Sequence, residues 1–162
     1  MAAPELASVR ALVFDVFGTV VDWRGSVIRA AETLGRAKGL SADWPRFADQ
    51  WRREGYVDAI GRIRRGEEPW ADADTLHRRK LDALLPDYGL GGLSEAEVAD
   101  LSRVWHRLDP WPDSVAGLTR LKRRFLAVQI AQQLRFEERQ GPREGGARTQ
   151  PFTRRGGAQS DR

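Results

Sequence analysis

The stretch that decides the fold of this chain is Leu12-Val13-Phe14-Asp15-Val16-Phe17-Gly18-Thr19. Residues 11–14 are apolar and favour a β-strand buried on both faces, so that Asp15 lies at the carboxyl end of that strand. Open α/β sheets bind ligands at this edge. Gly18 lets the backbone turn close to a ligand, and the Thr19 hydroxyl can donate a hydrogen bond that orients Asp15. The stretch predicts an α/β sheet carrying a nucleophilic aspartate; the alternative is a purely structural turn, in which Asp and Gly are both common.

A longer segment, residues 14–24 (FDVFGTVVDWR), resembles the first motif of the haloacid dehalogenase superfamily and, within it, of the type II 2-haloacid dehalogenases. The resemblance continues through residues 51–56 (WRREGY) and 105–113 (WHRLDPWPD) and then stops. It implies an α/β fold with a Rossmann-like core, here partial and truncated, and an inserted α-helical cap that closes over the nucleophile.

Phe17 separates two chemistries within that superfamily. Its phosphatases place a second Asp at this position, where it protonates the leaving alkoxide and helps to hold Mg²⁺. A halide leaves as a stable anion and needs no proton, and an apolar ring leaves the nucleophile less solvated. The resemblance therefore implies cleavage of the carbon–halogen bond of (S)-2-haloacids through an ester of Asp15, assisted by Thr19, without a metal or cofactor. The alternative for Phe17 itself is packing in the core.

The cap is expected to supply the cation that binds the substrate. In the resembled family an arginine that follows a tryptophan on a cap helix binds the anions of the reaction, and Trp51-Arg52 matches this pattern. If the segment is helical, Tyr56 shares the face of Arg52. The alternatives are an exposed surface role for Arg52, or Arg53 in its place. The predicted substrate-binding residues are Val16, Phe17, Trp23, Arg52 and Tyr56.

The region between the first strand and Pro112 is predicted to be all helical. Apolar residues recur at helical spacing over residues 27–34, 47–63, 76–85 and 98–108. Gly55 and Gly61 are expected to loosen the second helix, Pro86 to end the third, and Ser94 with Glu97 to form a capping box at the start of the fourth.

After the cap, residues 111–114 (WPDS) indicate a return to the core, with Asp113 or Ser114 capping a helix and residues 125–130 forming a second strand. The predicted organisation is a first strand and nucleophile loop over residues 1–22, a cap over 23–110, a partial return to the core over 111–131 and a tail over 132–162.

Beyond residue 130 both the expected family features and the apolar pattern of the chain end. The resembled family ends the second strand in a Ser-Asn pair and has a lysine further on, whereas here Ala131-Gln132-Gln133 follow and no lysine lies beyond Lys122. Residues 132–162 are rich in Gly and Arg, without apolar periodicity, which is a composition typical of disorder. One hypothesis is a truncated or shifted reading frame near residues 125–130. The alternatives to a dehalogenase are accordingly an inactive fragment or interaction protein, and a Mg²⁺-dependent phosphatase.

Composition limits the remaining classes. The chain has 162 residues, 41% of them hydrophobic, which is enough for one modest core. It has no cysteine, which excludes disulfides, thiolate metal sites and a cysteine nucleophile. His77 and His106 are too few and too far apart in sequence for a metal cluster, and are expected to be packing or surface residues.

The expected partner is a small-molecule 2-haloacid or a related carboxylate. The net charge of +4 comes from arginines scattered among Asp and Glu, so no nucleic acid is expected. The sequence shows neither a long apolar run nor a hydrophobic signal core, so no membrane is expected and a cytoplasmic location is the default. An exposed cap and an unfinished sheet favour a homodimer.

Overall fold

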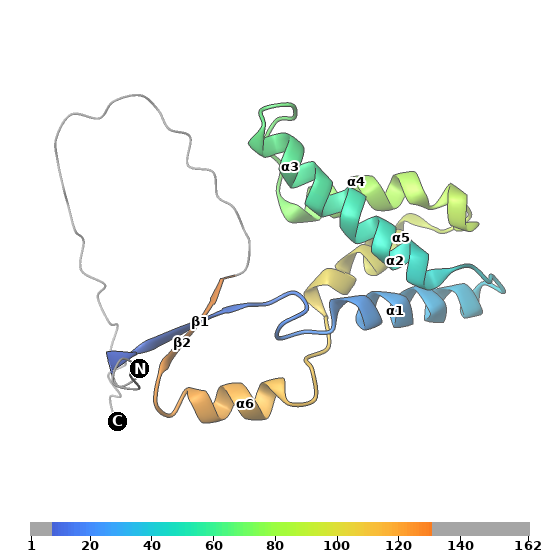
Figure 1. Cartoon of the computed structure of the whole chain (residues 1–162). Coiled ribbons are helices and arrows are strands. Elements are labelled where there is room, and N and C mark those ends of the chain that lie inside the picture. The colour runs from blue at the N-terminus through green and yellow to red at the C-terminus, as the bar shows by residue number, and fades with distance from the viewer. Residues whose placement is uncertain (1–7, 131–162) are drawn as a thin grey trace, which may run out of the picture.

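The computed structural model describes residues 8–130. The two strands and the last helix, which directly precedes the second strand, lie on one side of the molecule. The earlier helices lie on the other side (Figure 1). The elements in chain order are β1 (Ala11–Asp15), α1 (Trp23–Ala37), α2 (Trp44–Arg52), the π-helical turn η2 (Arg53–Val57), α3 (Asp58–Arg64), α4 (Ala73–Leu84), the 3₁₀ turn η3 (Pro86–Tyr88), α5 (Glu95–Ser102), the 3₁₀ turn η4 (Arg103–His106), α6 (Ser114–Leu121) and β2 (Leu126–Ile130).

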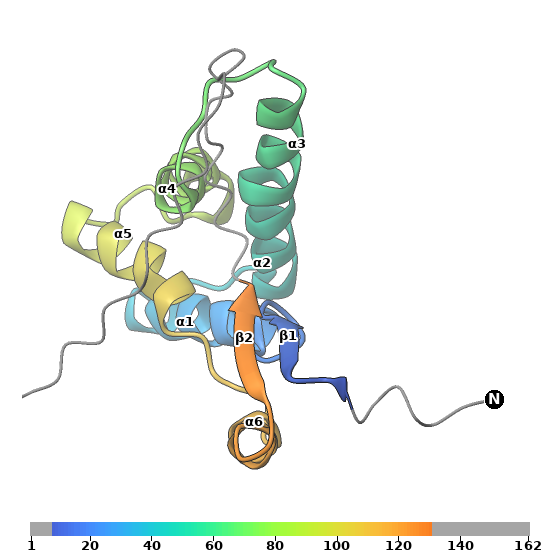
Figure 2. The ribbon, with the colours of Figure 1, turned by 90° about the vertical axis from the view of Figure 1, so that its left-hand side faces the viewer.

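The strands β1 and β2 are parallel, and their register runs from Ala11 opposite Leu126 to Asp15 opposite Ile130. The chain reaches β2 only after passing through all the helices of the insertion and then through α6, which lies beside the sheet (Figure 2). This confirms the predicted α/β class, the strand that ends at Asp15 and a second strand within residues 125–130. The predicted tail, residues 132–162, and the last residue of the predicted return to the core, Ala131, lie outside the described part of the chain.

The prediction that the first strand is buried on both faces is wrong for the described residues. Val13 is 58% exposed, Leu126 on β2 is 67% exposed, and no residue of α6 is buried. A strand buried on both faces needs neighbouring strands and helices on either side, and two strands with one helix do not supply them. The apolar core of this chain therefore lies elsewhere, and the expected homodimer stays a prediction.

That core lies among α1, α2, α4 and α5. Trp51 is completely buried there: its indole N–H donates to the His77 carbonyl over 2.8 Å, and its ring packs against Phe47 and Trp105. Large aromatic side chains contribute most to such a core because each removes much apolar surface from water. The buried cluster consists of Val27, Ala31, Trp44, Phe47, Ala48, Trp51, Leu81, Leu84, Leu85, Leu90, Val98, Leu101, Val104 and Trp105.

Several of the expected helix signals are confirmed. Both hydrogen bonds of the Ser94–Glu97 capping box form at the start of α5, and α4 ends before Pro86. The helix that begins at Trp44 widens into the π-turn η2 around Gly55, where an added Cβ would lie 2.9 Å from Lys80 Cβ. Gly55 thus permits the close approach of α4.

Two expected signals are wrong. Gly61 lies inside the regular helix α3 and does not loosen it, since a single glycine costs a helix only about 1 kcal/mol. At the start of α6 no side-chain hydrogen bond from Asp113 caps the helix, and the Ser114 hydroxyl donates instead to the Val20 carbonyl over 2.7 Å. Neither residue therefore caps α6 as predicted.

None of the helices described between residues 8 and 130 combines the length and the apolar character that a bilayer crossing requires.

Candidate active site

Asp15 is the last residue of β1, and the loop that follows it is closed by its own hydrogen bonds. The Val20 and Val21 amides both donate to the Val16 carbonyl, over 2.9 and 3.1 Å, and Gly18 adopts a positive φ of 94° that favours glycine. The Thr19 hydroxyl reaches back and donates to Asp15 Oδ2 over 3.1 Å. The predicted catalytic pair therefore lies together, with one carboxylate oxygen oriented and the side chain exposed at the sheet edge.

Residues 111–114, where the chain returns toward the sheet, hydrogen-bond to this loop. The Trp111 indole N–H donates to the Gly18 carbonyl over 3.0 Å, and the Trp111 amide donates to the Val20 carbonyl over 3.1 Å. The Ser114 hydroxyl bonds the same Val20 carbonyl. Sequence reasoning identified residues 111–114 only as a return to the core. Their supporting role joins positions more than ninety residues apart, as Trp111 and Gly18 are 93 apart, and no local pattern carries that information.

Arg52 lies at the end of α2 with its guanidinium among three aromatic rings. The guanidinium carbon is 4.9 Å from the centre of the Tyr56 ring, 5.3 Å from Phe17 and 5.8 Å from Trp23. These distances are within the range of cation–π attraction. We call Phe17, Trp23 and Tyr56 the aromatic cage. The structure thus brings together four of the five predicted substrate-binding side chains; Val16 contributes its backbone carbonyl to the nucleophile loop.

Burial lowers the pKa of Arg52, while the electrostatic attraction of Tyr56 and of Asp15 acts in the opposite direction. A guanidinium titrates so far above neutrality that it stays charged in this setting. The neighbouring Arg53 differs: its side chain is 81% exposed and lies 3.9 Å from Asp58. Between the two candidate arginines, only Arg52 therefore lies within the cage, where Asp15 attracts it electrostatically.

A column of stacked rings supports the aromatic cage from behind. The Tyr56 ring stacks on His77 at 5.3 Å, the His77 ring on Trp105 at 4.1 Å, and the Trp105 ring on Trp23 at 6.1 Å. His77 is only 5% exposed, and in the described part of the chain its Nδ1 atom has no hydrogen-bond partner. His77 is a packing residue, as expected, and His106 is a surface residue that pairs with Asp74 at 2.8 Å.

The buried His77 predicts that this region loses stability in weak acid. Burial, with a contribution from Arg52, lowers the pKa of His77 from 6.5 to about 3. The unfolded chain takes up this proton below pH 6.5, whereas the folded chain does not. The contribution of His77 to the free energy of unfolding is therefore fully present above pH 6.5 and is lost as the pH is lowered toward 3. The loss should approach about 1.4 kcal/mol per pH unit.

Denaturant unfolding at pH 7, 6 and 5 measures this slope. His77→Phe, which keeps the stacked ring, should flatten it, whereas the surface control His106→Gln should retain it. Equal slopes in the chain and in His77→Phe would show that His77 is not the acid-sensitive group. The carboxylates whose pKa values are lowered by ion pairs, such as Glu97 from 4.5 to about 2, lose their stabilising contribution mainly below pH 5, so they add little to the slope measured between pH 7 and 5.

Within residues 8–130, no group of three His, Asp or Glu side chains is arranged to hold a metal ion.

Comparison with solved structures gives a consistent set of similar proteins. The L-2-haloacid dehalogenase PA0810 is 41% identical, with a TM-score of 0.68 over 75% of this chain and 52% of that protein. The defluorinating L-2-haloacid dehalogenase Rha0230 is 40% identical, with a TM-score of 0.67 over 74% of this chain and 49% of that protein. An L-2-haloacid dehalogenase from Xanthobacter autotrophicus, solved with chloropropionic acid covalently bound, is 25% identical, with a TM-score of 0.58 over 75% of this chain and 46% of that protein.

The chain thus spans about half the length of these dehalogenases. No protein-family model matches it, and no curated protein matches it.

Proposed function

We propose that this chain, which has the haloacid dehalogenase-like fold over about half the length of the similar L-2-haloacid dehalogenases, carries the nucleophile and the cap of a hydrolase that removes halide from 2-haloacids. The observation that carries the proposal is the cation of Arg52 held among three aromatic rings and attracted electrostatically to Asp15, at the carboxyl end of β1. A carboxylate nucleophile beside a desolvated cation suits an anionic substrate that releases a second anion.

The reaction proceeds in two displacements. A carboxylate oxygen of Asp15 attacks the carbon that bears the halogen, the carbon–halogen bond breaks, and the halide leaves with the bonding electrons. Water then attacks the carbonyl of the Asp15 ester, which releases the 2-hydroxyacid and a proton and restores the carboxylate. Arg52 attracts the substrate carboxylate and the departing halide, and the Thr19 hydrogen bond keeps Asp15 oriented.

The aromatic cage supports this assignment over phosphate chemistry. Phe17 lies at the position where a phosphatase of the superfamily has its acid, and its ring centre is 5.3 Å from the Arg52 guanidinium. An apolar ring there can neither protonate an alkoxide nor bind Mg²⁺, whereas halide departure requires neither.

The experiment is halide release from (S)-2-chloropropionate, with the R enantiomer as the control. We expect release from the S enantiomer only, without added metal. A generic phosphate ester is tested in parallel with and without Mg²⁺. Mg²⁺-dependent phosphate release would replace the proposal with a phosphatase, and a folded chain that cleaves neither substrate would leave the interaction protein as the better assignment.

A further inference from the structure

The two connections between the sheet and the inserted helices lie side by side. The chain enters the insertion at Asp22 and leaves it at Asp109, and the Asp22 amide donates to the Asp109 carbonyl over 2.8 Å. The adjoining residues Val21 and Pro110 form an antiparallel bridge. Any movement of the helices relative to the sheet must therefore act on these two connections.

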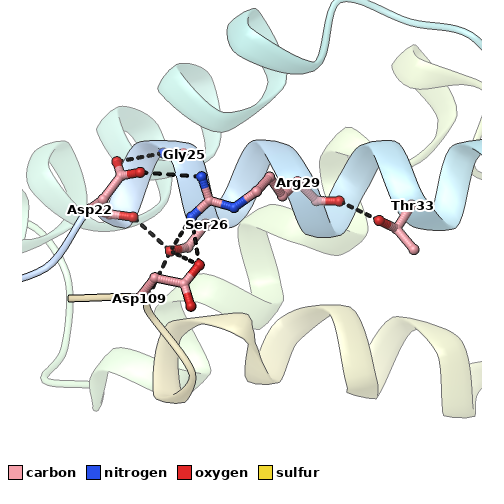
Figure 3. Close-up of polar contacts among 6 residues, drawn as sticks. All are labelled: Asp22, Gly25, Ser26, Arg29, Thr33 and Asp109. Atoms are coloured by element: carbon pink, nitrogen blue, oxygen red, sulfur yellow. Dashed lines mark hydrogen bonds and ion pairs between the residues drawn. The ribbon is translucent and has the colours of Figure 1, made fainter. Parts of the chain in front are cut away.

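Ser26, one turn into α1, joins the two connections through its hydroxyl. The hydroxyl donates to the Asp22 carbonyl over 2.7 Å, with Asp109 Oδ2 as a more distant acceptor at 3.4 Å, and it accepts from the Asp109 amide over 2.9 Å and from Arg29 Nη2 over 3.3 Å (Figure 3). A serine hydroxyl has one proton and two lone pairs, so the three shorter bonds use its whole capacity. Ser26 is only 5% exposed, which makes it a buried junction rather than a surface contact.

Arg29 adds a bridge between the carboxylates. Its Nη2 lies 2.6 Å from Asp109 Oδ2 and its Nη1 lies 3.3 Å from Asp22 Oδ2 (Figure 3). Removing this guanidinium would leave two like charges on adjacent connections, which repel each other. Gly25 leaves room for the arrangement, since an added Cβ would lie 2.0 Å from Asp22 Oδ2 and 2.7 Å from Arg29 Nη1. We call Asp22, Gly25, Ser26, Arg29 and Asp109 the clasp.

The clasp leads directly to the candidate active site. Trp23 follows Asp22, and its ring both borders the Arg52 guanidinium and stacks on Trp105. Arg24 then forms a two-bond ion pair with Asp49 on α2, at 2.7 and 2.8 Å, three residues before Arg52. The first turn of α1, which the clasp fixes, is therefore also the turn that holds the helix carrying Arg52.

We propose that Ser26 and Arg29 are positioning residues whose clasp sets the inserted helices relative to β1 and so keeps Arg52 beside Asp15. The placement itself is a property of the chain alone, whereas its effect on catalysis rests on the proposed function.

The absence of cysteine from the sequence permits a direct distance measurement. Spin labels on Ala83→Cys in α4 and Ala116→Cys in α6, both at exposed alanines, report the separation of the inserted helices from the sheet side by pulsed electron resonance. We expect a single narrow distance distribution for the otherwise unchanged chain. Arg29→Ala and Gly25→Ala should each broaden or shift it, and Arg29→Lys should restore much of it.

The matched control is Arg65→Ala, which removes an exposed Arg65–Glu67 ion pair of 2.6 Å that lies within the insertion. It should leave the distribution unchanged. Because Arg29 is half-exposed, Arg29→Ala leaves the buried core in place, and its thermal unfolding should stay close to that of the control. Distributions unchanged in both Arg29→Ala and Gly25→Ala would overturn the proposal.

Kinetics separate positioning from a merely structural role. Where the chain releases halide, Arg29→Ala should lower kcat by about tenfold to a hundredfold with a smaller change in KM, since a displaced catalytic group costs this much. Recovery of kcat in Arg29→Lys supports positioning, and an unchanged kcat contradicts it. A chain that releases no halide disproves the proposed function, whereas the distance distributions still decide whether the clasp places the helices.

Discussion

Replacing the proposed nucleophile, Asp15→Asn, should reduce halide release from a 2-haloacid by on the order of a thousandfold or more. The amide keeps the shape of the carboxylate, and its oxygen can still accept the Thr19 hydrogen bond that is 3.1 Å long in the present chain. It lacks the negative charge that attacks carbon. The loss would therefore come from the chemistry, with little change in the fold.

The intermediate can be observed without steady-state turnover. Acid-quenched chain mixed with excess 2-haloacid should gain the mass of one 1-carboxyalkyl group, esterified to Asp15, and the Asp15→Asn chain should gain none. Asp113→Asn is the matched control, since Asp113 belongs to the same side of the molecule and forms no side-chain cap on α6. Halide release at the normal rate by Asp15→Asn would mean that water attacks the substrate directly and that no ester forms.

The parts of the fold that the sequence predicts are those determined by neighbouring residues. The strand ending at Asp15 and the capping box at Ser94 depend on patterns a few residues long, and both form. The depth of burial is different, because it depends on what covers an element. Val13 belongs to an apolar strand and is nevertheless exposed, since nothing described on either side of the sheet covers it.

In the candidate site, too, only the contacts between residues close in sequence could be predicted. The Thr19–Asp15 hydrogen bond spans four residues and could be predicted. The choice of Arg52 over Arg53 depends on which side of a helix meets Phe17, and the π-turn that begins at Arg53 alters the phase of the helix at that point. Only the resemblance favoured Arg52 from the sequence.

The supporting contacts could not be predicted at all. Ser26 and Asp109 are 83 residues apart, and neither has a neighbour in sequence that suggests the other. His77 stacks between two aromatic rings that come from different segments, so its apolar setting has no local signature either. Such contacts join segments that are far apart in the sequence, and they are determined by the packing of the whole insertion.

The second large effect is expected at the cation: Arg52→Ala should lower kcat/KM for a 2-haloacid by about a hundredfold or more, as for other donors that stabilise developing negative charge. The guanidinium is half-buried among Phe17, Trp23 and Tyr56, so its removal leaves an apolar cavity into which an anionic substrate must carry its charge unpaired. Initial rates of halide release measure this loss, and Arg53→Ala, which removes an exposed arginine at the next position, should stay near the normal rate.

Arg52→Lys distinguishes charge from shape. A lysine keeps the positive charge but cannot stack its ammonium on three rings as a planar guanidinium does, so we expect partial activity. Burial also lowers the pKa of a lysine, and the ammonium exists only below that pKa, so the activity of this variant should fall as the pH rises toward the alkaline range while that of the Arg52 chain does not. A larger loss in Arg53→Ala than in Arg52→Ala would instead assign the anion site to Arg53, and would require the π-turn to rotate in the substrate complex so that the second arginine enters the aromatic cage.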